Sequence, residues 1–81
     1  MNAHVQMFAV ARQLAGREVV ELKLPADATV RQLRTALAAE VPALASLMPH
    51  LMFAINAEYA SDDAVIPAEA EIACIPPVSG G

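Results

Sequence analysis

The carboxyl end of the chain carries the residues whose types and spacing most directly suggest chemistry. Residues 76–81 read PPVSGG, and two of the three glycines of the chain, Gly80 and Gly81, stand together at its end. At average glycine usage, a Gly-Gly pair would occur at a given end in roughly 0.5% of chains, so chance explains it poorly. A frayed terminus or a cloning scar stays open as the alternative.

Glycines in this position suit a tail that enters a narrow channel in another protein. Glycine has no Cβ atom and tolerates positive φ angles, whereas any side chain at Gly81 would crowd the terminal carbonyl. Pro76 and Pro77 restrict φ and remove two backbone donors, so they form a stiff stem, although a plain strand terminator would have the same sequence. The partner-binding part of the tail is predicted to comprise Pro76, Pro77, Val78, Ser79 and Gly80.

The reactive group of such a tail would be the α-carboxyl of Gly81. An α-carboxyl group is ionised at neutral pH, and a carboxylate is a poor electrophile. We therefore expect that another protein must activate Gly81 before it can react.

Several other kinds of chemistry are not supported by the sequence. The net charge of −4, with only five Lys and Arg residues, argues against nucleic acid as a partner. No glycine lies between Gly16 and Gly80, which excludes a glycine-rich phosphate loop. His4, His50 and Cys74 match no zinc motif, and the alternating pattern around Cys74 indicates an inert core thiol. We expect no metal and no cofactor bound by this chain.

The amino-terminal sequence gives an indication of the cellular compartment of the protein. MNAHVQMFAV lacks the basic start and long apolar segment of a signal peptide, and no run of 18 apolar residues is present. The single cysteine suits a reducing compartment. We expect a cytoplasmic protein with no membrane partner.

Acidic residues are concentrated in the last third of the chain. No Lys or Arg follows residue 57, but five acidic residues do: Glu58, Asp62, Asp63, Glu69 and Glu71. They are interpreted either as solvated loop residues that keep an apolar chain soluble or as a negative surface that steers a basic partner. The sequence leaves both interpretations open.

Hydrophobic periodicity predicts a single α+β domain. Strands are expected at residues 3–10, 18–24, 51–57 and 71–76, with a short edge strand at 58–61. The first strand carries apolar residues on both faces, as a central strand does, and lies close enough to the second to pair with it as a hairpin. Between them, residues 11–16 form a short helical turn that Gly16 ends.

The main helix is predicted at residues 29–40. Thr29 and Gln32 have the spacing of a capping box at its start, and Asp27 just upstream offers an alternative cap. The apolar stripe that packs on the sheet is Val30, Leu33, Leu37 and Val41, while Arg31 and Arg34 are expected on the exposed side. Pro42 ends this helix and opens a second short helical segment at 42–48. A mixed sheet packed on one main helix follows from this order.

One face of the sheet is expected to remain partly uncovered. Strands such as HVQMFAV and LMFAI carry apolar residues on both sides, whereas one helix covers only one face. Exposed apolar surface of this kind marks binding sites. The candidate docking residues are Phe8, Met52, Phe53 and Ile75.

Three stretches resemble a known family: FAVARQLAG at residues 8–16, AIN at 54–56 before the acidic loop, and IPPVSGG at 75–81. Over essentially its whole length the chain resembles the molybdopterin synthase small-subunit family of sulfur carriers, which has the ubiquitin-like β-grasp fold. The Gly-Gly pair alone is shared with ubiquitin and the thiazole sulfur carrier. PPVSGG combined with the early motif points to the molybdopterin branch.

The resemblance implies a β-grasp domain at residues 1–75 and an extended reactive tail at 76–81. It implies that an ATP-dependent adenylating enzyme of the ubiquitin-activating type joins Gly81 to AMP, and that a sulfur donor then converts it to a thiocarboxylate. The tail would enter the large synthase subunit and donate sulfur to cyclic pyranopterin monophosphate, and two transfers would build the dithiolene of molybdopterin. The chain would be a non-catalytic, sulfur-donating subunit of a heterotetramer.

Other functions fit the same features. A sulfur carrier for thiazole synthesis and a ubiquitin-like modifier both use a Gly-Gly end. A plain β-grasp interaction module with an incidental tail is the remaining alternative.

Overall fold

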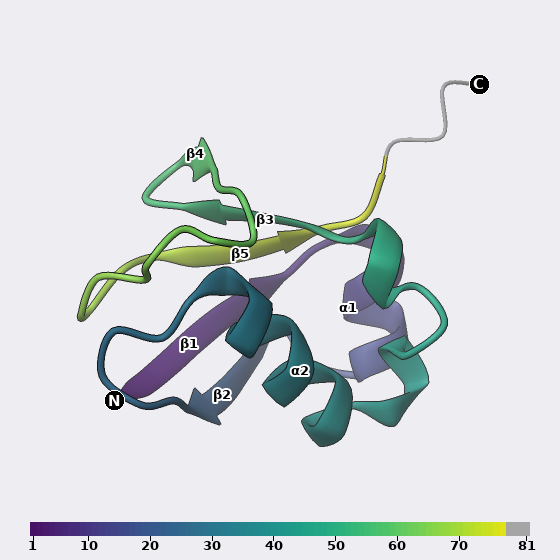
Figure 1. The fold of residues 1–81 in the computed structure, drawn as a ribbon. Coiled ribbons are helices and arrows are strands. Elements are labelled where there is room, and N and C mark those ends of the chain that lie inside the picture. Colours follow the sequence, from purple (N-terminus) through teal and green to yellow (C-terminus); the bar gives the residue numbers. More distant parts are fainter. Residues whose placement is uncertain (78–81) are drawn as a thin grey trace.

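A computed structural model of the chain describes residues 1–77, in which five strands form one mixed sheet of order β2-β1-β5-β3-β4 (Figure 1). The strands are β1 (Asn2–Met7), β2 (Val19–Lys23), β3 (Met52–Ile55), β4 (Glu58–Tyr59) and β5 (Ile72–Ile75). The helices are α1 (Ala9–Ala15) and α2 (Val30–Glu40), with single-turn 3-10 helices at Pro42–Leu44 and Met48–His50. The predicted order of elements and the mixed sheet on one main helix are confirmed.

The last strand, β5, lies in the centre of the sheet. It runs parallel to β1, with Met7 opposite Cys74, and antiparallel to β3, with Phe53 opposite Cys74. The predicted hairpin of β1 and β2 is present, with β2 at one edge. The predicted short strand forms the other edge as β4. The chain therefore runs toward its carboxyl end from the middle of the sheet (Figure 1).

The core lies between α2 and one face of the sheet, here called the inner face. Alternate residues of β1 point inward and are buried, as are Ile72 and Cys74 of β5. From α2, the buried residues are Val30, Leu33 and Leu37, three members of the predicted stripe, and Val41 just beyond the helix is buried too. The capping box of Thr29 and Gln32 is formed as predicted.

The first predicted strand ends earlier than its apolar run suggested. Phe8 still has an extended backbone, and its N–H donates to the carbonyl of Cys74 (3.2 Å). Ala9 then takes a φ of +51°, in the left-handed region, so the strand pattern stops and α1 begins two residues before the predicted turn. Gly16 ends α1 with a φ of +73°, as predicted.

Arg34 is not on the exposed side of α2, as the periodicity had indicated. Its guanidinium donates to the Asp62 carboxylate (2.8 Å) and to two backbone carbonyls, those of Met48 (2.8 Å) and Leu51 (2.6 Å). It also lies 4.9 Å from the centroid of the Phe53 ring, within the range of a cation–π contact. Arg34 therefore ties α2 to the segment that enters β3 and to the acidic loop.

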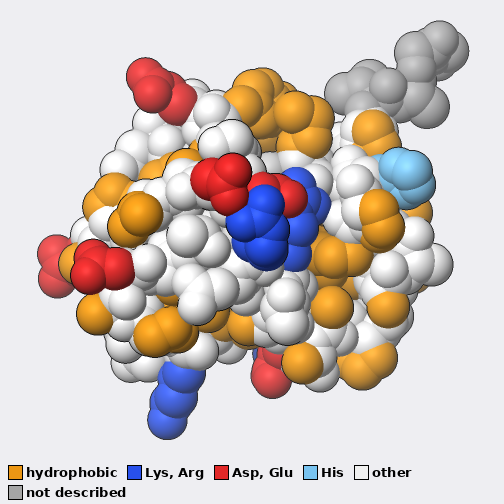
Figure 2. Space-filling model, viewed as in Figure 1, with side chains coloured by type: hydrophobic (Ala, Val, Ile, Leu, Met, Phe, Trp, Pro, Cys, Tyr) orange, Lys and Arg blue, Asp and Glu red, His pale blue; other side chains and the backbone are white. Residues whose placement is uncertain are grey.

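Two of the five clustered acidic residues are used within the fold. Asp62 pairs with Arg34, and Asp63 pairs with Arg31 (2.6 Å). The hydrogen bond from Arg31 to Asp63 raises the pKa of the guanidinium above its ordinary value. Figure 2 shows acidic and basic side chains in contact near the middle of the face that it displays. A steering role stays a prediction for Glu58, Glu69 and Glu71.

Replacement of Arg34 by alanine is expected to lower the free energy of unfolding by about 2 kcal/mol, because two carbonyls and a carboxylate lose a charged donor. The matched control is Arg31→Ala on the same helix. Its ion pair with Asp63 is exposed, so little change is expected. Urea unfolding followed by circular dichroism measures both. Equal losses for the two variants would contradict the role given to Arg34.

Candidate functional site

The tail predicted from the sequence is only partly within the described residues. Pro76 is buried and Pro77 is exposed directly after β5, so the chain leaves the packed body at Pro77. Val78, Ser79, Gly80 and Gly81 lie outside the described residues, and the roles assigned to them stay predictions. What the structure supplies is the surface from which the tail departs.

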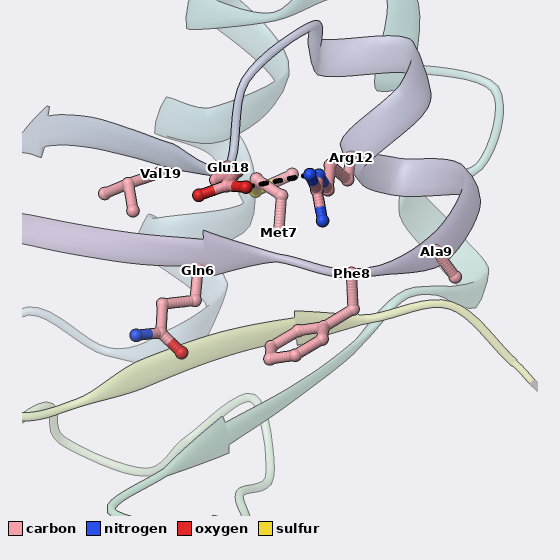
Figure 3. A pocket seen from close by; sticks show the side chains of 7 residues that line it. All are labelled: Gln6, Met7, Phe8, Ala9, Arg12, Glu18 and Val19. Atoms are coloured by element: carbon pink, nitrogen blue, oxygen red, sulfur yellow. Dashed lines mark hydrogen bonds and ion pairs between the residues drawn. The ribbon is translucent and has the colours of Figure 1, made fainter.

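That surface is the face of the sheet opposite α2. Strand register places Met52 opposite Ile75 and Ala54 opposite both Ala73 and Tyr59, with all their side chains on this outer face. Phe8 follows β1, and Figure 3 shows its ring lying toward β5 on the same side as Gln6. We call the following group the outer apolar face: Phe8, Met52, Ala54, Ala57, Tyr59, Ala73 and Ile75.

The outer apolar face is hollowed at its centre. Six of its members line a depression of about 360 Å³: Phe8, Ala54, Ala57, Tyr59, Ala73 and Ile75. The large side chains around it are well exposed, with Phe8 at 45%, Met52 at 45% and Tyr59 at 65% of their accessible surface. A shallow apolar depression with aromatic side chains around it fits a side chain of a protein partner.

Three of the four predicted docking residues lie on this face, and the fourth does not. Phe53 is 1% exposed, since it faces Cys74 across the inner side of β3 and packs beneath Arg34. The prediction for Phe53 is therefore wrong. In the continuous apolar run LMFAI, only strand register decides which neighbour points outward, and it selects Met52.

Tyr59 and the three alanines of the face were not predicted from the sequence as docking residues. The signal for Ala73 was the alternation within IACI, in which Ala73 shares a side with Ile75. Tyr59 lies on the edge strand that was expected, but an isolated aromatic residue gave no indication of a partner surface. Ala54 and Ala57 carry no chemical signal, and they matter here because small side chains leave the hollow open.

A charged pair borders the outer apolar face on the side of α1. Arg12 of α1 donates to Glu18, just before β2, across 2.8 Å, and both side chains are mostly exposed. They lie beside Phe8 in a groove of about 260 Å³ that also includes Gln6 and Val19 (Figure 3). Apolar contacts with charged residues at the margin are typical of protein–protein interfaces.

Cys74 lies beneath this face rather than on it. Burial raises the pKa of its thiol to about 11, with Arg34 acting weakly in the opposite direction. A neutral, buried thiol is unreactive, so the prediction of a core residue is confirmed. Within residues 1–77, no group of three or more His, Cys, Asp or Glu side chains is placed to hold a metal ion. In the same range, none of the helices has the length and apolar character needed to cross a membrane.

Comparison with known proteins identifies the family. The model of the ThiS family matches residues 5–81, almost the whole chain. The chain belongs to the ThiS family. The molybdopterin synthase sulfur carrier subunit of Arabidopsis thaliana is 36% identical over 77 residues, covering 95% of this chain and 80% of its own. The protein of the same name from Chlamydomonas reinhardtii is 36% identical with full coverage of both chains. The resemblance inferred from the sequence is confirmed.

A solved structure places this ThiS-family chain in its fold. The crystal structure of SAMP1 from Haloferax volcanii superimposes with a TM-score of 0.87, at 30% identity and with full coverage of both chains. The ubiquitin-like β-grasp fold predicted from the sequence is confirmed for the body of the chain.

The raised pKa of Cys74 predicts a specific pH dependence. Between about pH 9 and 11 the unfolded chain releases the thiol proton while the folded chain retains it, so stability present below pH 9 is lost as pH rises. From pH 8 to 10, we expect the free energy of unfolding of the wild type to fall by about 1 kcal/mol relative to Cys74→Ala. Urea unfolding of both proteins at pH 8 and pH 10 measures this change. A difference in unfolding free energy between the two proteins that is the same at both pH values would contradict the raised pKa of Cys74.

Proposed function

We propose that this chain is the sulfur carrier subunit of a molybdopterin synthase, with Gly81 as the sulfur-bearing residue. The observation that carries the proposal is its similarity, at 36% identity along the whole chain, to proteins that bear this name. The PPVSGG end supports it, because a carrier must present its terminal carboxyl to other proteins.

The chemistry proceeds in two stages. The Gly81 carboxylate attacks ATP on a separate adenylating enzyme, which forms an acyl-adenylate and releases pyrophosphate. A sulfur donor then attacks the acyl carbon and AMP leaves, so that the tail ends in a thiocarboxylate. The adenylating enzyme would hold the nucleotide, which agrees with the lack of a glycine-rich phosphate loop in this sequence.

In the second stage the tail enters the large subunit of the synthase, and its sulfur attacks cyclic pyranopterin monophosphate. Water then hydrolyses the bond between the Gly81 carbonyl carbon and the transferred sulfur, which leaves the sulfur on the pterin and regenerates the Gly81 carboxylate. Two such transfers supply the dithiolene in molybdenum cofactor biosynthesis. This chain contributes the nucleophile and no catalytic side chain. We expect two small and two large subunits in the assembly and a cytoplasmic location.

The outer apolar face supports the docking step of this proposal. It surrounds Ile75 at the end of β5, directly before the two prolines. A partner seated on this face would receive the tail at the point where the chain leaves the body. The exposed aromatic residues Phe8 and Tyr59 supply the kind of contact that dominates interface energies.

A ubiquitin-like modifier is a second candidate. The solved structure at 30% identity is described as SAMP1, and related structures carry the name small archaeal modifier protein 1. A modifier would use the same activated tail but transfer its acyl group to lysine amines. A sulfur carrier for thiazole synthesis would form the same thiocarboxylate and differ only in the acceptor.

Mass spectrometry of the intact protein, incubated with its adenylating enzyme, ATP and a sulfur source, separates these functions. We expect one oxygen atom at Gly81 to be replaced by sulfur, and sulfur transfer to cyclic pyranopterin monophosphate once the large subunit is added. Deletion of Gly81 should abolish product formation and leave the thermal unfolding curve unchanged. Product formed at a normal rate by the deletion variant would refute the mechanism, and stable lysine adducts would favour the modifier.

The docking face can be tested with a matched pair of variants. Phe8→Asp places a charge in the apolar hollow and should weaken binding of the large subunit by at least about tenfold. Leu14→Asp is the control, because Leu14 on α1 is exposed to a similar degree, 41% against 45%, but does not line the hollow. Isothermal titration of the large subunit measures both. Equal weakening by the two variants would argue against this face as the docking site.

A further inference from the structure

The edge strand β2 is open to a new strand. It pairs with β1 on one side, and no strand within residues 1–77 lies on its other side. The opposite edge of the sheet, β4, has only two residues, whereas β2 has five. Among the described strands, β2 therefore offers the longer template for additional backbone hydrogen bonds.

The backbone groups that point away from β1 can be identified from the register. At the two ends of the β1–β2 pair, Met7 N–H donates to the carbonyl of Glu18 (2.8 Å) and Leu24 N–H to that of Met1 (2.8 Å). Hydrogen-bonded pairs alternate in an antiparallel ladder, so the even-numbered residues of β2 bond to β1. The N–H and C=O groups of Val19, Glu21 and Lys23 consequently face the open edge.

The outer side of this edge carries one acidic and one basic side chain. Glu21 and Lys23 lie on the outer face of β2, two residues apart and both exposed. Charged edge residues normally prevent pairing between sheets, because most registers oppose like charges or leave charges unmatched. When two β2 strands pair antiparallel, however, one register places every one of these charges opposite a charge of the other sign.

We propose that two copies of this chain associate through β2, with Glu21 of each copy opposite Lys23 of the other. A twofold axis at Leu22 produces this register. Glu21 and Lys23 then form hydrogen-bonded pairs, each exchanging two backbone bonds, and two Glu–Lys side-chain pairs form on the outer face. A twofold axis at Glu21 would instead oppose two glutamates, and one at Val20 would leave Lys23 without an acid.

The inner side of the edge has room for the second copy. A groove of about 510 Å³ runs between β2 and α2, and its lining includes Leu22, Ala36 and Ala39 together with the charged Glu21, Lys23 and Glu40. The small alanines keep α2 from covering the strand edge. In the proposed pair, the two Leu22 residues lie opposite each other at the twofold axis, while each Leu22 side chain stays buried in its own core.

Self-association at β2 is independent of the proposed sulfur chemistry. β2 is separated from β5 by β1, so pairing at this edge leaves the end of β5 and the outer apolar face accessible (Figure 1). A pair of carriers could then present two tails at once.

Sedimentation equilibrium over micromolar to millimolar concentrations tests the pairing. Glu21→Lys and Lys23→Glu should each weaken dimerisation by about tenfold or more, because both cross-strand pairs become repulsive. The double exchange, E21K with K23E, recreates two Glu–Lys pairs and should restore wild-type dimerisation. Glu58→Lys on β4 changes the net charge as Glu21→Lys does, and it should not weaken the dimer.

Amide hydrogen exchange of the unaltered protein gives a second measurement. The amides of Glu21 and Lys23 should become protected as concentration rises, while those of Val20 and Leu22 are protected throughout. A protein that stays monomeric at millimolar concentration overturns the proposal. So does a double exchange that fails to restore the dimer, or a Glu58→Lys variant as disruptive as Glu21→Lys. Thermal unfolding of each variant confirms that the monomer remains folded.

Discussion

The central position of β5 is the constraint on which the rest of the structure depends. A terminal strand at an edge would be held on one side only, and chain ends fray readily. Here the last strand is bonded to β1 on one side and to β3 on the other, and the side chain of its residue Cys74 is fully buried in the core. The bond from Phe8 N–H to the Cys74 carbonyl continues the pairing almost to the end of the strand. Pro76 and Pro77, which follow, are thus attached to a strand that is bonded on both of its sides.

The same arrangement leaves the sheet covered on one side only. One main helix supplies the inner layer, and within residues 1–77 no second helix of that length covers the outer face. That outer face is divided along the strands: His4 and Glu21 lie in contact (3.0 Å) in its polar half, whereas apolar side chains surround the end of β5. An exposed apolar hollow therefore includes Ile75, two residues before the chain leaves the packed body, and exposed apolar surface of this kind marks binding sites.

Sequence patterns predicted the helices and strands better than they predicted which side chains of each element point outward. The capping box at Thr29 and the left-handed Gly16 are each set by local chemistry, and each is found as predicted. The choice between Met52 and Phe53 depends on the alignment of β3 with β5, which are linked by no local signal. Arg34 was misplaced for a similar reason: helical periodicity gives its direction from α2, but its carbonyl partners belong to a loop whose path the sequence does not display. The reactive tail was inferred from composition and resemblance alone.

The contacts of Arg34 also bear on which of Met52 and Phe53 faces outward. A shift of one residue in the register of β3 would turn Phe53 outward and Met52 inward, since successive side chains point to opposite faces. The carbonyl of Leu51, immediately before β3, and that of Met48, in the preceding 3-10 helix, both accept from the Arg34 guanidinium, which fixes where the strand begins. The guanidinium also lies over the Phe53 ring, a contact available only when that ring faces inward. Through these contacts, a half-buried arginine on the inner side of the sheet determines which side chains form the outer apolar face on the other side.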